Sequence, residues 1–289
     1  MKTFRGRQRR FQATVDSLRV KPDAALPWRV LPLRVAAAAT LIEEGLALLE
    51  GLPDNPVPTL RWYRSTAAAV VLGRGQRRAL QQVRAARAAD DAGDRRRPGR
   101  LPLVWRASGG GAVLMDPGLL SLDVVVPAEH PLAAGDLGAV FLRIGEAWRA
   151  ALAELGVPGL TVHTGPATAR RTGDARERVV AAICYATSGR GEVLAGGRKL
   201  VGLAQRRRRA GVLVQCGLLR TWDPAPLLAL FAPLLDEGEP HAALARELRQ
   251  AAVGLDELLG RRAPTDAAVM AAVERHLVRA QGMVSGRAW

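Results

Sequence analysis

Two periodic segments in the middle of the chain give the clearest structural signals. In residues 119–127, apolar side chains occupy the even positions Leu120, Leu122, Val124 and Val126, whereas Ser121 and Asp123 share the other face. This is the period of a strand with one apolar face. Further along, large apolar side chains recur at every fourth position, as one face of a helix requires: Val140, Ile144, Trp148 and Leu152. Gly156 and Pro158 then end the predicted helix.

The other periodic segments are shorter and predict a mixed order of elements. Strands are expected at 27–33, 59–65, 68–76, 192–195, 198–205 and 211–216, and helices near 41–49, 226–234, 241–253 and 265–280. Asp116-Pro117-Gly118 has turn composition and predicts a hairpin over 110–127, and Gly196-Gly197 predicts a second tight turn. Residues 84–100 predict a frayed helix and a surface loop, and residues 164–178 a mobile polar loop. This order indicates an α+β fold rather than a regular βαβ alternation.

The composition is that of a globular protein. Its 289 residues are 48% hydrophobic, which suffices for a sizeable core, and the basic residues 1–26 predict a disordered tail. No apolar run is long enough to cross a bilayer, and the N-terminus lacks the apolar part of a secretory signal. We therefore expect a cytoplasmic protein, in which two cysteines do not make a disulfide framework.

The net charge of +15 predicts an acidic partner, either nucleic acid or an acidic carrier protein. Aromatic residues make up 4%, no basic and aromatic residues interleave, and no zinc-finger, zipper or RNP-type segment occurs. These absences disfavour nucleic acid. A coding preference for arginine is an alternative source of part of the charge.

The segment SGGGAV at 108–113 is the first candidate for chemistry. Consecutive glycines let a backbone approach a ligand closely and can cradle an anion, although a flexible hairpin entry has the same composition. It opens a strand and not a helix, so it is not a dinucleotide fingerprint. The spacing of Gly191 and Gly196 fits a phosphate loop, but the required Gly-Lys-Ser/Thr is absent.

Lys199 stands out because the chain has three lysines and the other two, Lys2 and Lys21, lie in the tail. Strict alternation places it on one face with Val201, Leu203 and Gln205. Lysine is a compact charge that can titrate when buried, which arginine cannot do, so Lys199 is a candidate pocket residue. Chance survival of one lysine is the alternative.

Cys184 is either a small core residue or a nucleophile whose thiolate is favoured near Lys199 and Arg190. The four histidines have no metal-ligand spacing, so no metal site is expected, and His163 is left as a candidate partner for Cys184. The arginine run at 206–209 is either a solvated turn or a docking site for an acidic protein.

Together, three motifs in one order resemble the lipoate/octanoate attachment family, the biotin/lipoate-ligase-like catalytic domain. They are TLRWYRSTAAAVVLGRGQ, WRASGGGAVLMDPGLLSLDVVVP and GGRKLVGLAQRRRRAGVLVQCGLL, within a match from Trp28 to Leu277. The resemblance implies one catalytic domain over 27–289 with mixed β-sheets flanked by helices. It implies Cys184 and Lys199 as catalytic residues, and a set of substrate-binding residues. These are Arg106, Ser108, Gly109, Gly110, Gly111, Ala112, Asp116, Gly202, Ala204 and Gln205.

The family has two chemistries. Transferases move octanoate from acyl carrier protein through a cysteine thioester without a cofactor, whereas ligases activate free lipoate with ATP. In both, the acceptor is a lysine of a lipoyl-carrier domain, such as the glycine cleavage H protein or the 2-oxoacid dehydrogenase E2 subunit. Cys184 lies fifteen residues before Lys199, as in cysteine transferases, and residues 189–192 lack the asparagine of ligases. We therefore expect a transferase.

Four positions depart from the family pattern at sites that the resemblance places in the pocket: Trp105, Met115, Leu203 and Cys216. They keep a non-catalytic acyl- or carrier-binding relative as a further alternative, because a fold does not fix a function.

Overall fold

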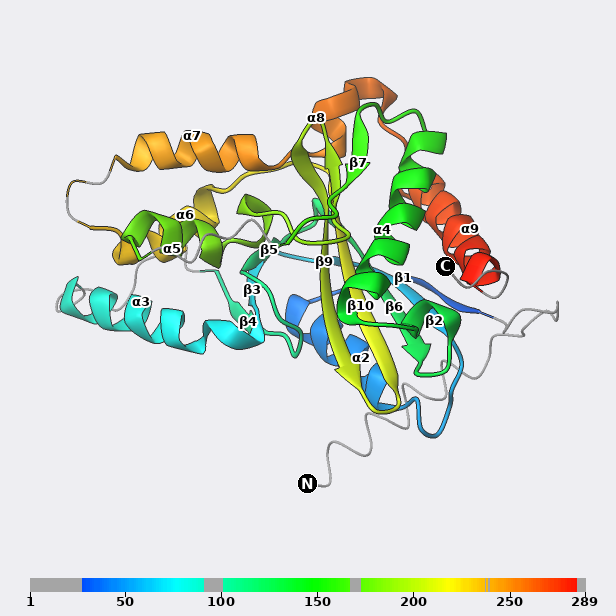
Figure 1. Ribbon diagram of the computed structural model, residues 1–289. Helices are drawn as coiled ribbons and strands as arrows, with labels where there is room; N and C mark the ends of the chain where they lie inside the picture. The colour runs from blue at the N-terminus through cyan, green and yellow to red at the C-terminus, as the bar shows by residue number, and fades with distance from the viewer. Residues whose placement is uncertain (1–27, 91–100, 167–172, 237, 239, 285–289) are drawn as a thin grey trace.

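The computed structural model describes residues 28–90, 101–166, 173–236, 238 and 240–284 (Figure 1). The predicted tail at 1–26 lies outside the described residues, and so does the predicted loop at 91–100.

Within the described residues, seven strands form the larger of two sheets. In spatial order they are β1 (Arg29–Ala36), β2 (Thr59–Ser65), β6 (Leu119–Pro127), β10 (Gly211–Leu219), β9 (Arg198–Arg208), β8 (Val193–Ala195) and β7 (Leu160–Val162). β1 and β2 are parallel, and all the other neighbouring pairs are antiparallel. Gly196 and Gly197 join β8 to β9 with φ of 56° and 78°, which confirms the predicted tight turn.

A smaller sheet lies beside the large one. Its strands are β4 (Leu103–Trp105), β3 (Ala69–Leu72) and β5 (Val113–Met115). The predicted turn forms, because Asp116 Oδ1 accepts a hydrogen bond of 2.8 Å from Gly118 N, but the predicted hairpin over 110–127 is wrong. β5 pairs with β3, whereas β6 pairs on its two edges with β2 and β10, so neither edge of β6 is left for β5. The turn carries the chain from one sheet to the other.

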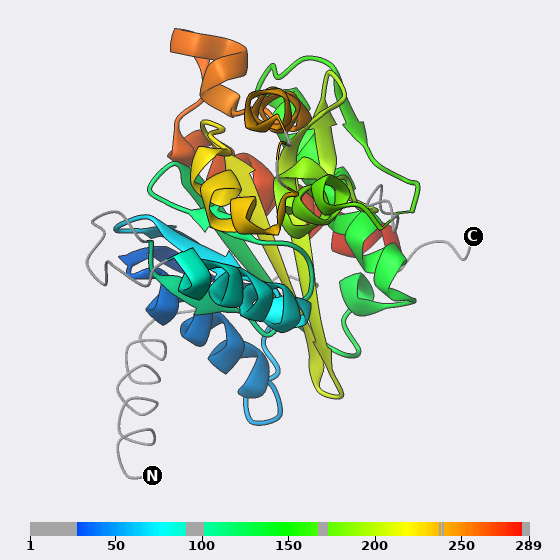
Figure 2. The ribbon, with the colours of Figure 1, turned by 90° about the vertical axis from the view of Figure 1, so that its left-hand side faces the viewer.

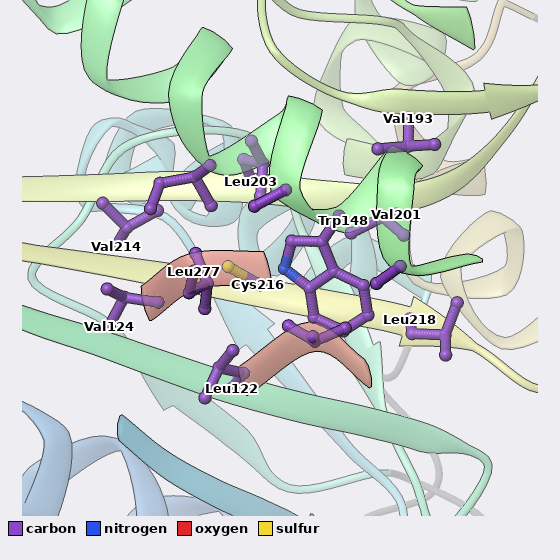
Figure 3. Packing of buried hydrophobic residues seen from close by; sticks show 14 of the residues in the cluster. Leu122, Val124, Trp148, Val193, Val201, Leu203, Val214, Cys216, Leu218 and Leu277 are labelled. Carbon is purple, nitrogen blue, oxygen red and sulfur yellow. The ribbon is translucent and has the colours of Figure 1, made fainter. Parts of the chain in front are cut away.

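Helices cover the two faces of the large sheet differently (Figures 1 and 2). On one face, α4 (Leu137–Glu154) and α9 (Asp266–Val284) pack over the even-numbered side chains of β6 and β10. Trp148 of α4 lies at the centre of that core, beside Leu277 of α9 (Figure 3). The other face is covered by the small sheet, by α2 (Ala38–Glu50) and, along β9, by α7 (His241–Ala251). Three further helices pack around the small sheet in the same hydrophobic cluster: α3 (Arg77–Asp90), α5 (Ala175–Ala182) and α6 (Ala225–Phe231).

Local chemistry explains where several helices begin. Asp136 Oδ1 caps α4 by accepting a hydrogen bond from Ala139 N at 2.7 Å, and the predicted face of α4 is buried as expected. The predicted mobile loop at 164–178 is wrong in its last residues. Asp174 Oδ1 accepts from Glu177 N at 2.6 Å and starts α5 there. The short elements β4, β7 and α8 (Leu255–Leu259) were not predicted.

Candidate active site

Lys199 reaches the site because β9 contains an irregularity. Between β8 and β9, Val193 pairs with Val201 and Leu194 with Lys199, so Leu200 is an extra residue in β9. Leu200 and Val201 both lie in the core beneath α4. Lys199 therefore turns to the opposite face, which it shares with Gly202. The predicted placement of Lys199 on the face of Val201 is wrong, because a bulge shifts the alternation by one residue.

The Lys199 ammonium lies among four acceptor atoms, and its side chain is 1% exposed. Nζ is 2.6 Å from Glu192 Oε1, 2.8 Å from Cys184 O, 3.2 Å from Thr187 O and 3.6 Å from Cys184 Sγ. Burial opposes the charge, but the Cys184 sulfur and the Glu192 carboxylate outweigh it and raise the pKa of Lys199 above its ordinary value of 10.5. Lys199 is therefore a persistent cation beside the sulfur.

The backbone of Cys184 is fixed by the glycine-rich segment. Ala112 N donates to Ala182 O at 2.7 Å, and Cys184 N donates to Ala112 O at 2.9 Å. A methyl group on Gly111 would lie 2.7 Å from Cys184 N and 2.8 Å from Ala182 O, so the close approach requires glycine here. The glycine-rich segment and the cysteine segment thus form one unit.

Arg106 holds the glycine-rich segment from within. Its guanidinium donates to Gly109 O at 2.8 Å, to Gly111 O at 2.8 Å and to Val71 O at 3.3 Å. Burial lowers the pKa of Arg106, and the nearby Cys184 sulfur opposes that shift. Arginine stays charged in proteins, so Arg106 is a second cation near the sulfur.

A buried polar network continues from the glycine-rich segment into the sheet. Ser108 Oγ donates to Gln215 Oε1 at 2.6 Å, and the Gln215 amide hydrogen-bonds Asp123. Asp123 Oδ2 also accepts from Arg61 at 2.5 Å, and Oδ1 accepts from Tyr63 at 3.1 Å. Half-satisfied buried networks are costly, so this satisfied network fixes the position of Ser108.

A pocket that is partly open to solvent lies between the two sheets. Cys184 lies on its wall, and the lining crosses the sheet from Gly202 on β9 to Tyr63 on β2 and Ile42 on α2. Three strand spacings of about 4.8 Å make this crossing about 14 Å long. Between these ends, the lining includes Val71, Val113, Met115 and Leu119. The shape and lining suit a long apolar group.

The structure brings together part of the predicted substrate-binding set. Arg106, Gly202 and Ala204 line the pocket with Cys184, whereas Ser108, Gly111 and Ala112 hold the segments behind it. Gly109 and Gly110 are exposed. Asp116 lies in the turn before β6 and is not part of the lining.

Gln205 and two of the divergent positions lie differently from the pocket residues. Gln205 lies two residues after Leu203 and so on the same face of β9, and its buried amide has no hydrogen-bond partner among the described residues. Leu203 and Cys216 border the pocket, but their side chains pack in the core with Trp148 (Figure 3). Their departures from the family pattern therefore mainly alter the core. Met115 lines the pocket, and Trp105 is an exposed aromatic.

Glu192 and Tyr185 are site residues that sequence reasoning missed. Glu192 Oε2 accepts from Gly189 N at 2.6 Å, so the carboxylate that holds Lys199 is itself fixed. Tyr185 Oη donates to Gly217 O at 2.6 Å, and its ring centroid is 5.0 Å from Lys199 Nζ. An acidic residue directly before the apolar strand β8 was the available signal for Glu192.

The other candidates contribute differently. Burial raises the pKa of the Cys216 thiol far above its ordinary value, so it is a neutral core group. His163 Nε2 lies 3.0 Å from Pro166 O, and the Arg190 side chain packs against Gly138. Among the described residues, neither side chain makes a hydrogen bond or ion pair with Cys184. The described residues contain no group of three or more metal-ligating side chains that could hold an ion. Among the helices of the described ranges, none has both the length and the apolar character that a membrane crossing needs.

Comparison with known proteins decides the family. The model of the lipoyl protein ligase A/B catalytic domain matches residues 43–278. The chain belongs to this family. Octanoyltransferase LipM of Moorella thermoacetica is 34% identical over 237 residues, which cover 81% of this chain and 80% of that protein. Octanoyltransferase LipM of Symbiobacterium thermophilum is 31% identical over 236 residues, which cover 81% and 79%.

Solved structures agree at the level of the fold. Lipoate-protein ligase A bound with ATP has a TM-score of 0.55 at 20% identity, covering 87% of this chain and 84% of that one. The lipoyl protein ligase A/B family and the mixed fold predicted from the sequence are thereby confirmed.

Proposed function

We propose that this protein transfers an octanoyl group from a carrier thioester, through Cys184, to a lysine of a lipoyl-carrier domain. The observation that carries the proposal is the Cys184 sulfur, which lies 3.6 Å from the Lys199 ammonium on the wall of a largely apolar pocket. Similarity to octanoyltransferases over four-fifths of the chain supports the acyl group and the enzyme class.

In the first step, the Cys184 thiolate attacks the carbonyl carbon of the incoming thioester. A new C–S bond forms, the bond to the carrier sulfur breaks, and the carrier leaves as a thiolate that takes up a proton. The Lys199 ammonium stabilises the negative charge on sulfur before attack and can donate a hydrogen bond to the leaving sulfur. The octanoyl chain lies along the pocket toward Ile42.

In the second step, the neutral amine of the acceptor lysine attacks the enzyme thioester. An amide bond forms, the C–S bond to Cys184 breaks, and the amine loses a proton as the thiolate returns beside Lys199. The acyl group arrives already activated as a thioester, so neither step consumes ATP.

The test is formation of the acyl-enzyme. Wild-type protein is incubated with octanoyl acyl carrier protein, and its intact mass is measured before and after hydroxylamine, which cleaves thioesters. We expect a gain of one octanoyl group that hydroxylamine removes and that is lost in Cys184→Ala. Cys216→Ala is the matched control and should keep the adduct, because Cys216 is a buried neutral thiol.

Three outcomes overturn the proposal. ATP-dependent attachment of free lipoate without an acyl-enzyme identifies a ligase. Failure to restore growth of a strain that cannot make lipoate, with no adduct in vitro, identifies a binding relative. An adduct that persists in Cys184→Ala places the nucleophile elsewhere.

A further inference from the structure

A cluster of arginines lies where β9 leaves the pocket. Arg206 and Arg208 follow Ala204 at the period of a strand, so they continue the face that lines the pocket. Arg74 follows β3 of the smaller sheet, where its backbone N–H donates to Ser108 O at 3.0 Å, and it is close enough for its charge to act on Arg206. Desolvation and the positive charges of Arg208 and Arg74 lower the pKa of Arg206, which agrees with a tight cluster of like charges.

Among the described residues, Arg74, Arg206 and Arg208 form no ion pair, and Arg206 Nε is buried without a hydrogen-bond partner. Glu50 is the acidic residue whose charge acts on Arg206. Arg207, on the opposite face, differs: its guanidinium donates to Ala133 O at 2.8 Å and to Gly135 O at 3.0 Å. Arg207 therefore helps to hold two segments together, whereas Arg206 and Arg208 form no ion pair among the described residues.

The basic surface continues along the start of α3. Arg77 and Arg78 are exposed, and the Arg77 guanidinium lies 5.6 Å from the ring centroid of Trp105, which is 37% exposed. Tryptophan and arginine are the residue types that most often anchor protein interfaces. This surface therefore offers positive charge together with an exposed aromatic ring.

We propose that Arg74, Arg206 and Arg208 form the docking surface for the acidic carrier protein that delivers the acyl thioester. The inference rests on the proposed function, since the surface borders the pocket whose wall carries Cys184. Charge complementarity is the argument for this occupant: three cations that form no ion pair among the described residues, in a chain of net charge +15, attract an acidic surface and orient it on the pocket. Such steering raises the association rate and weakens as salt screens the charges.

The experiment separates docking from chemistry with two acyl donors. The rate of enzyme acylation is measured with octanoyl acyl carrier protein and with an octanoyl thioester of a small uncharged thiol. Arg208→Glu should lower kcat/KM for the carrier protein by at least about tenfold at low salt and leave the small thioester unaffected. Arg279→Glu is the matched control. It makes the same charge change at an exposed position of α9, on the opposite face of the sheet, and should leave both rates unchanged.

Binding of the unacylated carrier protein gives a readout that needs no chemistry. We expect salt-dependent binding to the wild-type protein that Arg74→Glu and Arg208→Glu both weaken. Unchanged carrier kinetics in Arg208→Glu, equal loss with both donors, or tighter binding of duplex DNA than of the carrier protein overturns the inference. If the carrier binds this surface but neither donor acylates Cys184, the proposed function fails and the docking surface stands.

Discussion

Replacing Glu192 with glutamine tests the buried charge pair on which Lys199 depends. The change keeps the shape of the side chain but removes its charge. It also puts an NH₂ group in place of one of the two oxygens, which accept hydrogen bonds from Leu203 N, Gly189 N and Lys199 Nζ. The ammonium then keeps Cys184 O and Thr187 O as neutral acceptors.

The expected cost follows from burial. The side chains of Lys199 and Glu192 are 1% and 6% exposed, and removing one partner of a buried ion pair typically costs about 3–5 kcal/mol. Because two carbonyl acceptors remain, we expect the lower end, about 3 kcal/mol. At about 2–4 °C per kcal/mol for a chain of this size, Glu192→Gln should melt roughly 6–12 °C below the wild type.

The pH dependence distinguishes this cause from general damage. In the wild type the pKa of Lys199 is raised, so the pair stabilises the fold below pH 10.5 and loses its effect as pH rises through the folded-state pKa. In Glu192→Gln, the Cys184 sulfur alone is left to oppose burial, and we expect the pKa of Lys199 to fall below 10.5. The unfolded state then binds more protons, and the stability of the variant rises with pH. The difference in unfolding free energy between the two proteins should therefore narrow from pH 7 toward pH 10.

Urea unfolding at several pH values measures that difference. Glu146→Gln is the control. It removes the carboxylate of an exposed pair with Arg149, in which the side chains are 54% and 38% exposed, and should cost less than about 1 kcal/mol. A loss below about 1 kcal/mol in Glu192→Gln, or a gap that does not change with pH, would refute the reasoning.

Two further predictions concern the reacting groups. Lys199→Arg should keep the fold but lower single-turnover acylation by about 10²–10³-fold, because the guanidinium is wider than the ammonium and cannot take its place between the Cys184 sulfur and the Glu192 carboxylate; an unchanged rate in the folded variant contradicts the site. Gly111→Ala should slow acylation and cost about 1–3 kcal/mol, because its methyl group meets the backbone at Cys184. Gly109→Ala, whose methyl group meets nothing within 4 Å, should leave the unfolding free energy unchanged, and an equal loss of stability in the two variants would argue against the proposed packing.

The order of the motifs and the periodicity of the longest elements could be read from the sequence. Side-chain alternation in β6 and the four-residue repeat in α4 are local properties of the backbone, so both faces were predicted correctly. The special character of Lys199 was also visible, because composition alone showed it to be the one lysine outside the tail.

Tertiary structure decided how these pieces meet. A single extra residue in β9, Leu200, moves Lys199 to the other face, and its position depends on the register between two strands. The turn at Asp116 joins two sheets instead of closing a hairpin, because β6 takes both its partners from distant segments. Glu192 meets Lys199 only after β8 and β9 pair. Local propensity fixes which face of a segment is apolar, whereas long-range strand pairing fixes which polar side chains are buried together.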